Sequence, residues 1–174
     1  MLYAFDKKQP IVGKDTYISE LASVIGDVDI GDNCYIGHGA IIRGDYGRIE
    51  IGSGTAVEEG VIVHAPPKKT HQIGNNVTIG HGAVLHGKQI LDFAVIGMGA
   101  VVSIFAQVGE WAIVAEGAIV RMNQVVPDRV VMAGNPAEVI REISDKDLEH
   151  WTRGKKIYVD LAKKYLKEGM IPLV

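Results

Sequence analysis

The chain has 174 residues, a formal net charge of −3 and 21 glycines. This length suits one domain with a sizeable core, and we expect a single domain over residues 1–174. The charge gives no electrostatic reason to expect a nucleic acid or an anionic membrane surface as partner. One cysteine, Cys34, cannot form an intramolecular disulfide, and the first residues lack the apolar core of a signal peptide. We therefore expect a cytoplasmic protein that spans no membrane.

Aliphatic residues recur every six positions from about residue 12 to about residue 131. The period is interrupted by three extra residues near residues 46–49, by an insertion at residues 66–72 and by a block that is one residue short before residue 90. The positions of this column are all Ile, Val or Leu: Val12, Ile18, Val24, Ile30, Ile36, Ile42, Ile51, Val57, Val63, Ile73, Ile79, Leu85, Ile90, Ile96, Val102, Val108, Val114, Val120 and Val126. A sandwich or barrel of short strands would alternate with a period of two. A period of six instead predicts an all-β solenoid, in which each hexad makes a short strand and a corner.

This pattern resembles the left-handed parallel β-helix of the hexapeptide-repeat proteins, in which three hexads make one coil. The left hand is implied by the resemblance alone, because the general rule for parallel crossovers favours the right hand.

The end of the chain has a different pattern, over residues of about 144–168. Ser144 and Asp147 have the spacing of a capping box, although Asp replaces the usual Glu. Apolar residues then recur at helical spacing: Leu148, Trp151, Tyr158, Leu161, Ala162 and Tyr165. We expect an α-helix packed along the prism, with its lysines in solvent: Lys155, Lys156, Lys163, Lys164 and Lys167.

Two histidines occupy equivalent positions on adjacent coils. His64 follows Val63 and His86 follows Leu85, and these two aliphatic positions are three hexads apart. The imidazoles are therefore expected to stack about 4.8 Å apart, the spacing of neighbouring strands, and both can reach one metal ion. His81 lies in the preceding hexad, on another side of the prism. It can join the pair only from a neighbouring subunit, as in a threefold assembly.

Arg43 falls one coil before His64 in the same column, with Asp45 close by. A guanidinium beside a metal site would suit a small carboxylate-like anion. The alternative is a structural ion pair between Arg43 and Asp45 at a subunit interface, and the two roles are compatible.

The three other histidines are interpreted as surface residues: His38, His71 and His150. A general-base role in acyl transfer is the alternative for one of them.

Three stretches, IIRGDYGRIEIG, AVEEGVIVHA and TIGHGAVLHG, resemble in this order the γ-class carbonic anhydrases, including short bacterial and archaeal members. The resemblance runs from Val12 to the final helix. It implies a homotrimer with metal sites at the subunit interfaces, each with two histidines from one subunit and one from the next. By motif the ligands are His64, His81 and His86, and His81 is the one that crosses the interface.

The same resemblance assigns roles to residues around the metal. Arg43 and Asp45 occupy positions associated with interface pairing and bicarbonate, and Tyr158 matches an aromatic position near the metal. The family's Asn-x-Gln-Asp-Gly motif is altered here, because Glu58 replaces the glutamine that orients water and substrate and Glu59 follows it. Glu58 is therefore a candidate base, an additional ligand or a source of repulsion for bicarbonate. The acidic loop of the longest members is replaced by a short basic insertion.

The resemblance implies a metal-dependent enzyme that reversibly hydrates CO2 to bicarbonate by metal-bound hydroxide, with Glu58, Glu59 and Tyr158 as the catalytic candidates. Ligation by histidine suits Zn²⁺, with Fe²⁺ or Co²⁺ as alternatives. Two other functions stay open, because one fold serves many functions. One is a coenzyme A-dependent acyltransferase or thioesterase, and the other is a non-catalytic, metal-bound trimeric scaffold.

Overall fold

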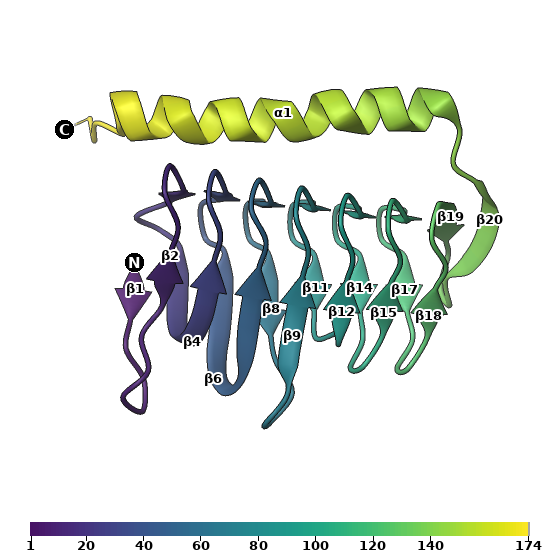
Figure 1. Ribbon diagram of the computed structural model, residues 1–174, viewed down its shortest axis with the longest axis horizontal. Coiled ribbons are helices and arrows are strands. Elements are labelled where there is room, and N and C mark those ends of the chain that lie inside the picture. The colour runs from purple at the N-terminus through teal and green to yellow at the C-terminus, as the bar shows by residue number, and fades with distance from the viewer. Residues whose placement is uncertain (174) are drawn as a thin grey trace.

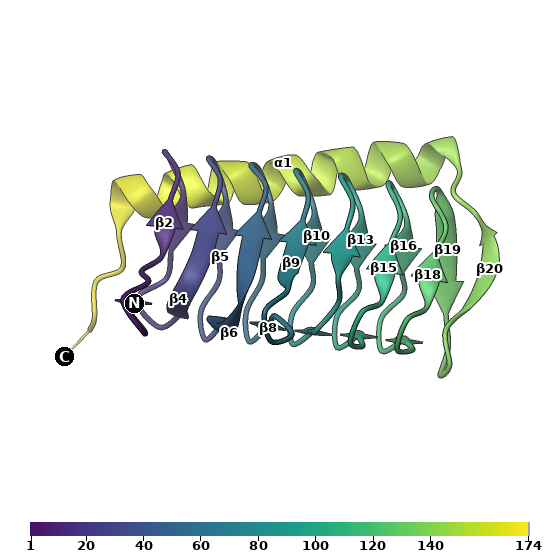
Figure 2. The ribbon, with the colours of Figure 1, turned by 60° about the horizontal axis from the view of Figure 1, so that its bottom comes forward.

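A computed structural model describes residues 1–173 and shows a parallel β-solenoid of about seven turns, with one long helix lying along its side (Figure 1). The predicted left-handed β-helix of hexapeptide repeats with a C-terminal α-helix is thereby confirmed. Figure 2 shows that the helix follows the whole row of coils in a second view. Within the described residues no helix is both long and apolar enough to cross a membrane.

The strands line three faces of a prism. The first and second faces belong to one twelve-stranded sheet, because two long strands, β4 (Ser23–Ile30) and β6 (Ile41–Ile51), pass round the corner between them. The first face is completed by β1 (Leu2–Tyr3), β8 (Ile62–His64), β11 (Val84–Leu85), β14 (Val101–Val102) and β17 (Ile119–Val120). The second face is completed by β2 (Ile11–Val12), β9 (Thr70–Ile73), β12 (Gln89–Ile90), β15 (Gln107–Val108) and β18 (Val125–Val126).

The third face is a separate eight-stranded sheet. It contains β3 (Tyr17–Ile18), β5 (Tyr35–Ile36), β7 (Ala56–Val57), β10 (Thr78–Ile79), β13 (Val95–Ile96), β16 (Ile113–Val114), β19 (Val130–Ala133) and β20 (Glu138–Glu142). All pairs are parallel except β19 with β20, which is antiparallel and turns the chain back towards the helix.

The aliphatic column forms the core of the prism. Of the nineteen positions, all except Val12 and Ile18 are at most 4% exposed. Equivalent residues stack coil on coil, as Ile36, Val57 and Ile79 do through the β5–β7–β10 pairing. Burial of these side chains is the main stabilising contribution, because each fully buried aliphatic side chain contributes about 1.5–3 kcal/mol. The six-residue period is therefore the direct signature of the core.

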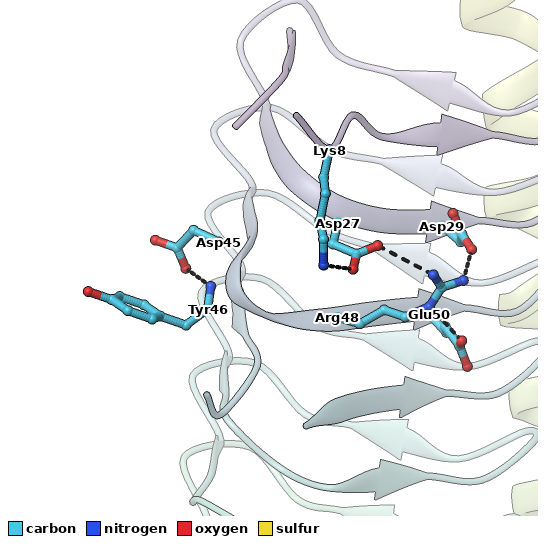
Figure 3. Close-up of polar contacts among 7 residues, drawn as sticks. All are labelled: Lys8, Asp27, Asp29, Asp45, Tyr46, Arg48 and Glu50. Carbon is cyan, nitrogen blue, oxygen red and sulfur yellow. Dashed lines mark hydrogen bonds and ion pairs between the residues drawn. The ribbon is translucent and has the colours of Figure 1, made fainter. Parts of the chain in front are cut away.

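The extra residues near residues 46–49 form a bulge at the corner between the first and second faces. There the register of β4 with β6 shifts, and Arg48 is held by three carboxylates (Figure 3). Its Nε donates to Glu50 Oε1 at 2.8 Å, and its other nitrogens bond to Asp27 and Asp29. Asp45 and Tyr46 lie at the other side of this bulge (Figure 3). The long strand turns the corner at this bulge, and its pairing with β4 resumes with Val28 opposite Ile49.

The helix α1 (Asp145–Glu168) begins with the expected capping box. Ser144 accepts a hydrogen bond from the Asp147 backbone N–H, and the Asp147 carboxylate accepts one from the Ser144 backbone N–H. The helix is continuous through Gly154 and packs on the third face, where Tyr158, Leu161 and Tyr165 contact the outward-facing tyrosines of β3 and β5.

The prediction that Lys155 lies in solvent is wrong, since this side chain is only 5% exposed. It belongs to the face of α1 that meets the prism, between Trp151 and Tyr158 at helical spacing. Its Nζ lies 3.2 Å from Thr78 Oγ1 on the third face. The other predicted surface lysines of α1, Lys156, Lys163, Lys164 and Lys167, are exposed.

Candidate metal centre

Two imidazoles stack on the first face, at its edge with the second face. His64 ends β8 and His86 directly follows β11, and the two strands pair with Leu85 opposite Val63. The ring centroids of His64 and His86 are 4.8 Å apart, and the ring planes are inclined by 40°. The parallel pairing of hexads thus produces the stacked pair from residues 22 positions apart.

The donor chemistry of this pair fits a metal ion. His86 Nε2 is buried and has no hydrogen-bond partner within residues 1–173. An orphaned buried nitrogen costs free energy and therefore needs an explanation. Burial, followed by the nearby His64 and Arg43, lowers the pKa of His86, which favours the neutral imidazole that ligates metals. A metal ion shared by the two imidazoles would satisfy the orphaned nitrogen.

Arg43 and Asp45 support the pair from the preceding coil. Arg43 is in register with His64, and its Nη1 lies 2.5 Å from Asp45 Oδ2. The other oxygen of Asp45 lies 3.1 Å from His64 Nε2. Burial by itself would raise the pKa of Asp45, but the hydrogen bonds from Arg43 and His64 hold it below its usual range. A carboxylate that accepts from one ring nitrogen fixes the orientation of the imidazole and leaves the other nitrogen for a ligand.

His81 lies at the opposite edge of the first face, at the corner after β10. It is 46% exposed, and both of its ring nitrogens meet carboxylates: Nε2 lies 3.0 Å from Glu58 Oε2, and Nδ1 lies 2.7 Å from Glu59 Oε2. The backbone N–H of His81 also donates to Glu58. Both carboxylates follow β7, one coil earlier, so the stacking of coils explains the cluster.

The two carboxylates have different environments. Glu58 is 5% exposed, and this burial raises its pKa against the opposing effects of Tyr158 and His81. Burial would also raise the pKa of Glu59, but a hydrogen bond from Tyr35, 2.6 Å long, helps to lower it. Tyr158 of α1 lies over Tyr35, with ring centroids 5.4 Å apart, and burial and hydrogen bonding to Glu58 raise the pKa of Tyr158. Through Tyr158, α1 therefore covers the cluster of Glu58, Glu59 and His81.

Within one chain the predicted residues form two clusters. Arg43, Asp45, His64 and His86 lie together, while His81 lies with Glu58, Glu59 and Tyr158. Among residues 1–173 no three His, Cys, Asp or Glu side chains are placed to hold one metal ion. A metal ion on the His64–His86 pair would therefore need a further ligand from outside these residues.

The histidines outside the predicted set differ in their surroundings. His150 is exposed on α1, and His38 is partly buried between Ser19 Oγ at 2.6 Å and Tyr165 OH at 3.2 Å. The surface interpretation of His71 is wrong, because this residue is fully buried. Its Nδ1 lies 3.3 Å from the carbonyl oxygen of His64, and burial lowers its pKa to about 4.

Two residues near the site were missed at the level of sequence. His71 points inward because β9 begins at Thr70, so that His71 is in register with the buried Ile49. Its spacing of two from the inward Ile73 was the available signal. Tyr35 was missed because its hydroxyl reaches Glu59, which lies 24 residues later on the next coil. A single outward-facing tyrosine does not form a recognisable sequence motif.

Comparisons with known proteins agree with this architecture. The model of the bacterial transferase hexapeptide family (six repeats) matches residues 9–44. The chain is 37% identical to "Gamma carbonic anhydrase 2, mitochondrial" of Arabidopsis thaliana over 97% of its own length, and it spans 63% of that protein. It is 38% identical to the carnitine operon protein CaiE of Salmonella agona, covering 92% of this chain and 81% of CaiE. A crystal structure of a hexapeptide transferase family protein from Anaplasma phagocytophilum superposes with a TM-score of 0.90 at 31% identity, over 95% of this chain and 98% of the other.

The similarity to CaiE and to the Anaplasma protein extends over most of both chains. The chain belongs to the hexapeptide-repeat family of left-handed β-helix proteins, in the group that includes the γ carbonic anhydrases and CaiE.

Proposed function

We propose that the protein is a metal-dependent enzyme of the γ carbonic anhydrase type, which interconverts CO2 and bicarbonate. The observation that carries this proposal is the stacked pair of His64 and His86, with an orphaned ring nitrogen in a buried setting. The similarity to a γ carbonic anhydrase over 97% of this chain supports the same reaction.

The proposal includes a homotrimer in which the first face of each prism meets a neighbour. Three outward aliphatic side chains of this face, Ile41, Ile62 and Val84, are in register on adjacent coils and are 39–42% exposed. They form an apolar stripe between the edge that carries the histidine pair and the edge that carries His81. Burying such a stripe favours association of subunits, and a ring of three prisms would then bring His81 of one subunit to the pair of the next.

His64, His86 and a neighbouring subunit's copy of His81 would hold the metal ion in this assembly. For His81 to bind a metal, one of its two contacts with Glu58 and Glu59 has to open. Ligands that are all imidazole suit Zn²⁺, Fe²⁺ or Co²⁺. When bound, such an ion supplies a water whose pKa is lowered from 15.7 to about 7.

The other residues then have separate tasks. Arg43 offers a planar fork of N–H donors to a carboxylate-like anion such as bicarbonate, and Asp45 orients both this guanidinium and His64. Glu58 and Glu59 contact His81 of their own subunit, so they would lie near the metal ion that this histidine helps to bind. They are the candidates for accepting the proton released in hydration. Tyr158 holds Glu58 in place from α1.

The proposal is tested by stopped-flow CO2 hydration on protein of measured metal content, prepared with zinc and, anaerobically, with iron. We expect hydration that is lost when the metal is removed. The His86→Ala variant should lose both metal and activity, whereas His150→Ala, which changes an exposed histidine of α1, should keep both.

A Glu58→Gln variant distinguishes an inhibited site from an absent activity. If the parent is inactive and Glu58→Gln is active, the charge of Glu58 holds a complete site in check. If both are inactive with about one metal per chain, the hydration proposal fails and a metal-bound scaffold becomes the better account.

A coenzyme A-dependent acyltransferase or thioesterase is a second candidate, favoured by a basic groove on the second face. A cavity of about 610 Å³ is lined by Lys69, Lys88 and Phe105, among others, and cationic and aromatic side chains suit a nucleotide-bearing anion. Among residues 1–173 no histidine lines this groove. Retention on immobilised coenzyme A, lost in a Lys69→Glu, Lys88→Glu variant, would support this candidate.

A further inference from the structure

Lys155 is buried between α1 and the third face of the prism. It is 5% exposed, and no other lysine or arginine of residues 1–173 is buried. A buried ammonium normally requires a carboxylate partner, because removing a charge from water is energetically costly. None is found here: among residues 1–173 the hydrogen-bond partners of Nζ are Thr78 Oγ1 and Ala94 O, each at 3.2 Å.

These two partners suit a neutral amine. Nζ donates to the Thr78 hydroxyl oxygen and to the Ala94 carbonyl oxygen, and both acceptors are uncharged. Neither partner therefore offsets the charge of an ammonium, and burial without a counter-charge favours the neutral amine. Burial is the sole cause that lowers the pKa of Lys155, to about 7. At neutral pH a large fraction of this side chain is therefore an uncharged nucleophile.

Lys155 is one of the residues that line a cavity. Its volume is about 260 Å³, and it is lined by Asn76, Phe93, Thr152, Lys155, Lys156 and Val159. No carboxylate lines it, whereas Lys156 adds an exposed ammonium and Thr152 a hydroxyl. The cavity thus offers positive charge and a hydrogen-bond donor to an anion formed on Lys155.

We propose that Lys155 is a second carbon dioxide-binding residue, whose amine forms a carbamate in this cavity. The Nζ lone pair attacks the carbon of CO2, an N–C bond forms, and one C–O π bond opens to leave a carboxylate. A proton of the attacking nitrogen passes to solvent water, so the product is an N-carboxylate with one negative charge. CO2 suits the site because it is small and uncharged and can enter where a charged ligand would first have to lose its hydration. The reaction needs no metal and goes beyond the proposed hydration activity.

The carbamate is detected on the purified protein by equilibration with ¹³C-labelled CO2 at pH 8, alkylation with triethyloxonium ion to trap the labile group, and peptide mass spectrometry. At pH 8 the neutral fraction of an amine of pKa about 7 is roughly two hundred times that of an exposed lysine of pKa about 10.4. We therefore expect the label on the peptide carrying Lys155 in large excess over the peptides of exposed lysines. At the same CO2 pressure the label should fall at least tenfold at pH 6, where the amine is mostly protonated.

Matched variants locate the adduct. Lys155→Met should lose the label, and Lys156→Met, which alters the exposed neighbour, should keep it on Lys155 at reduced occupancy. The wild-type experiment assigns the labelled residue by fragmentation, so it decides the question even if a variant folds poorly. Recovery of an unlabelled Lys155 peptide, with label confined to exposed amines or absent altogether, would overturn the proposal.

Discussion

Replacing Lys155 by methionine should change how the stability of the protein depends on pH. The amine is buried with its pKa lowered to about 7, whereas the same amine in the unfolded chain has a pKa of about 10.4. Between these values the unfolded chain binds more protons than the folded one. The free energy of unfolding of the wild type therefore rises with pH across this window, and it is lowest where the buried amine must be protonated. Methionine has a similar shape and no charge, so the variant lacks this dependence.

The size of the effect follows from the burial. The shift of the pKa to about 7 corresponds to roughly 4–5 kcal/mol of destabilisation at low pH. Methionine removes that penalty but leaves the Thr78 hydroxyl without its partner Nζ, which costs about 1–3 kcal/mol. The variant should thus be more stable than the wild type by roughly 1–4 kcal/mol near pH 6. Near pH 10.5 it should be less stable by about 1–3 kcal/mol.

The assay is urea unfolding followed by circular dichroism, in CO2-free buffers from pH 6 to pH 10.5 and at one protein concentration, because assembly shifts apparent stability. Lys156→Met serves as the control, since that lysine is exposed, and its difference from the wild type should be nearly constant with pH. If the difference between wild type and Lys155→Met is also constant with pH, the amine is not buried in a neutral form.

Three further changes test the fold and the assembly. Ser144→Ala removes the side-chain cap of α1 and should lower the free energy of unfolding by about 0.5–2 kcal/mol in thermal melts; an unchanged melting temperature would contradict the capping box. Ile79→Ala opens a cavity at a position that is 0% exposed and should cost about 2–5 kcal/mol by urea unfolding, whereas a loss below 1 kcal/mol would mean that the coils collapse around the gap. Ile62→Asp places a charge in the apolar stripe, so sedimentation should show monomers and metal analysis a parallel loss of bound metal. A metal-loaded trimer in this variant would refute the assignment of the first face as the interface.

The β-helix could be predicted because its core residues are Ile, Val or Leu and recur at a period of six. Each coil contributes inward aliphatic side chains at fixed positions, and the interruptions in the period are absorbed at corners. The three extra residues near residues 46–49 are an example, since Arg48 and its carboxylate partners hold the bulge while Ile51 returns to the column. The same period of six also predicted that His64 and His86 stack on adjacent coils, because the aliphatic residues that precede them are three hexads apart.

The two errors have a common physical origin. Both His71 and Lys155 were assigned to solvent because of their polarity, although each occupies an inward position of its element: His71 lies two residues before the buried Ile73, and Lys155 continues the buried face of α1. The polarity of these two residues suggested exposure, whereas their positions along the strand and the helix suggested burial. The structure shows that both are buried. What sequence reasoning lacked was the partner that makes each burial tolerable, namely the His64 carbonyl for His71 and the Thr78 hydroxyl for Lys155.

The proposed metal centre also explains why its histidines are divided between two edges of one face. His81 and His86 belong to consecutive hexads, so they lie in the same coil and at nearly the same height along the prism. A rotation about an axis parallel to the prism therefore brings the His81 edge of one subunit to the His86 edge of the next without a shift along the axis, which is the condition for a closed ring. A slip of one coil, about 4.8 Å, would carry His81 past the pair. The apolar stripe and the metal would consequently select the same register, so that assembly of the trimer and completion of the site become one event.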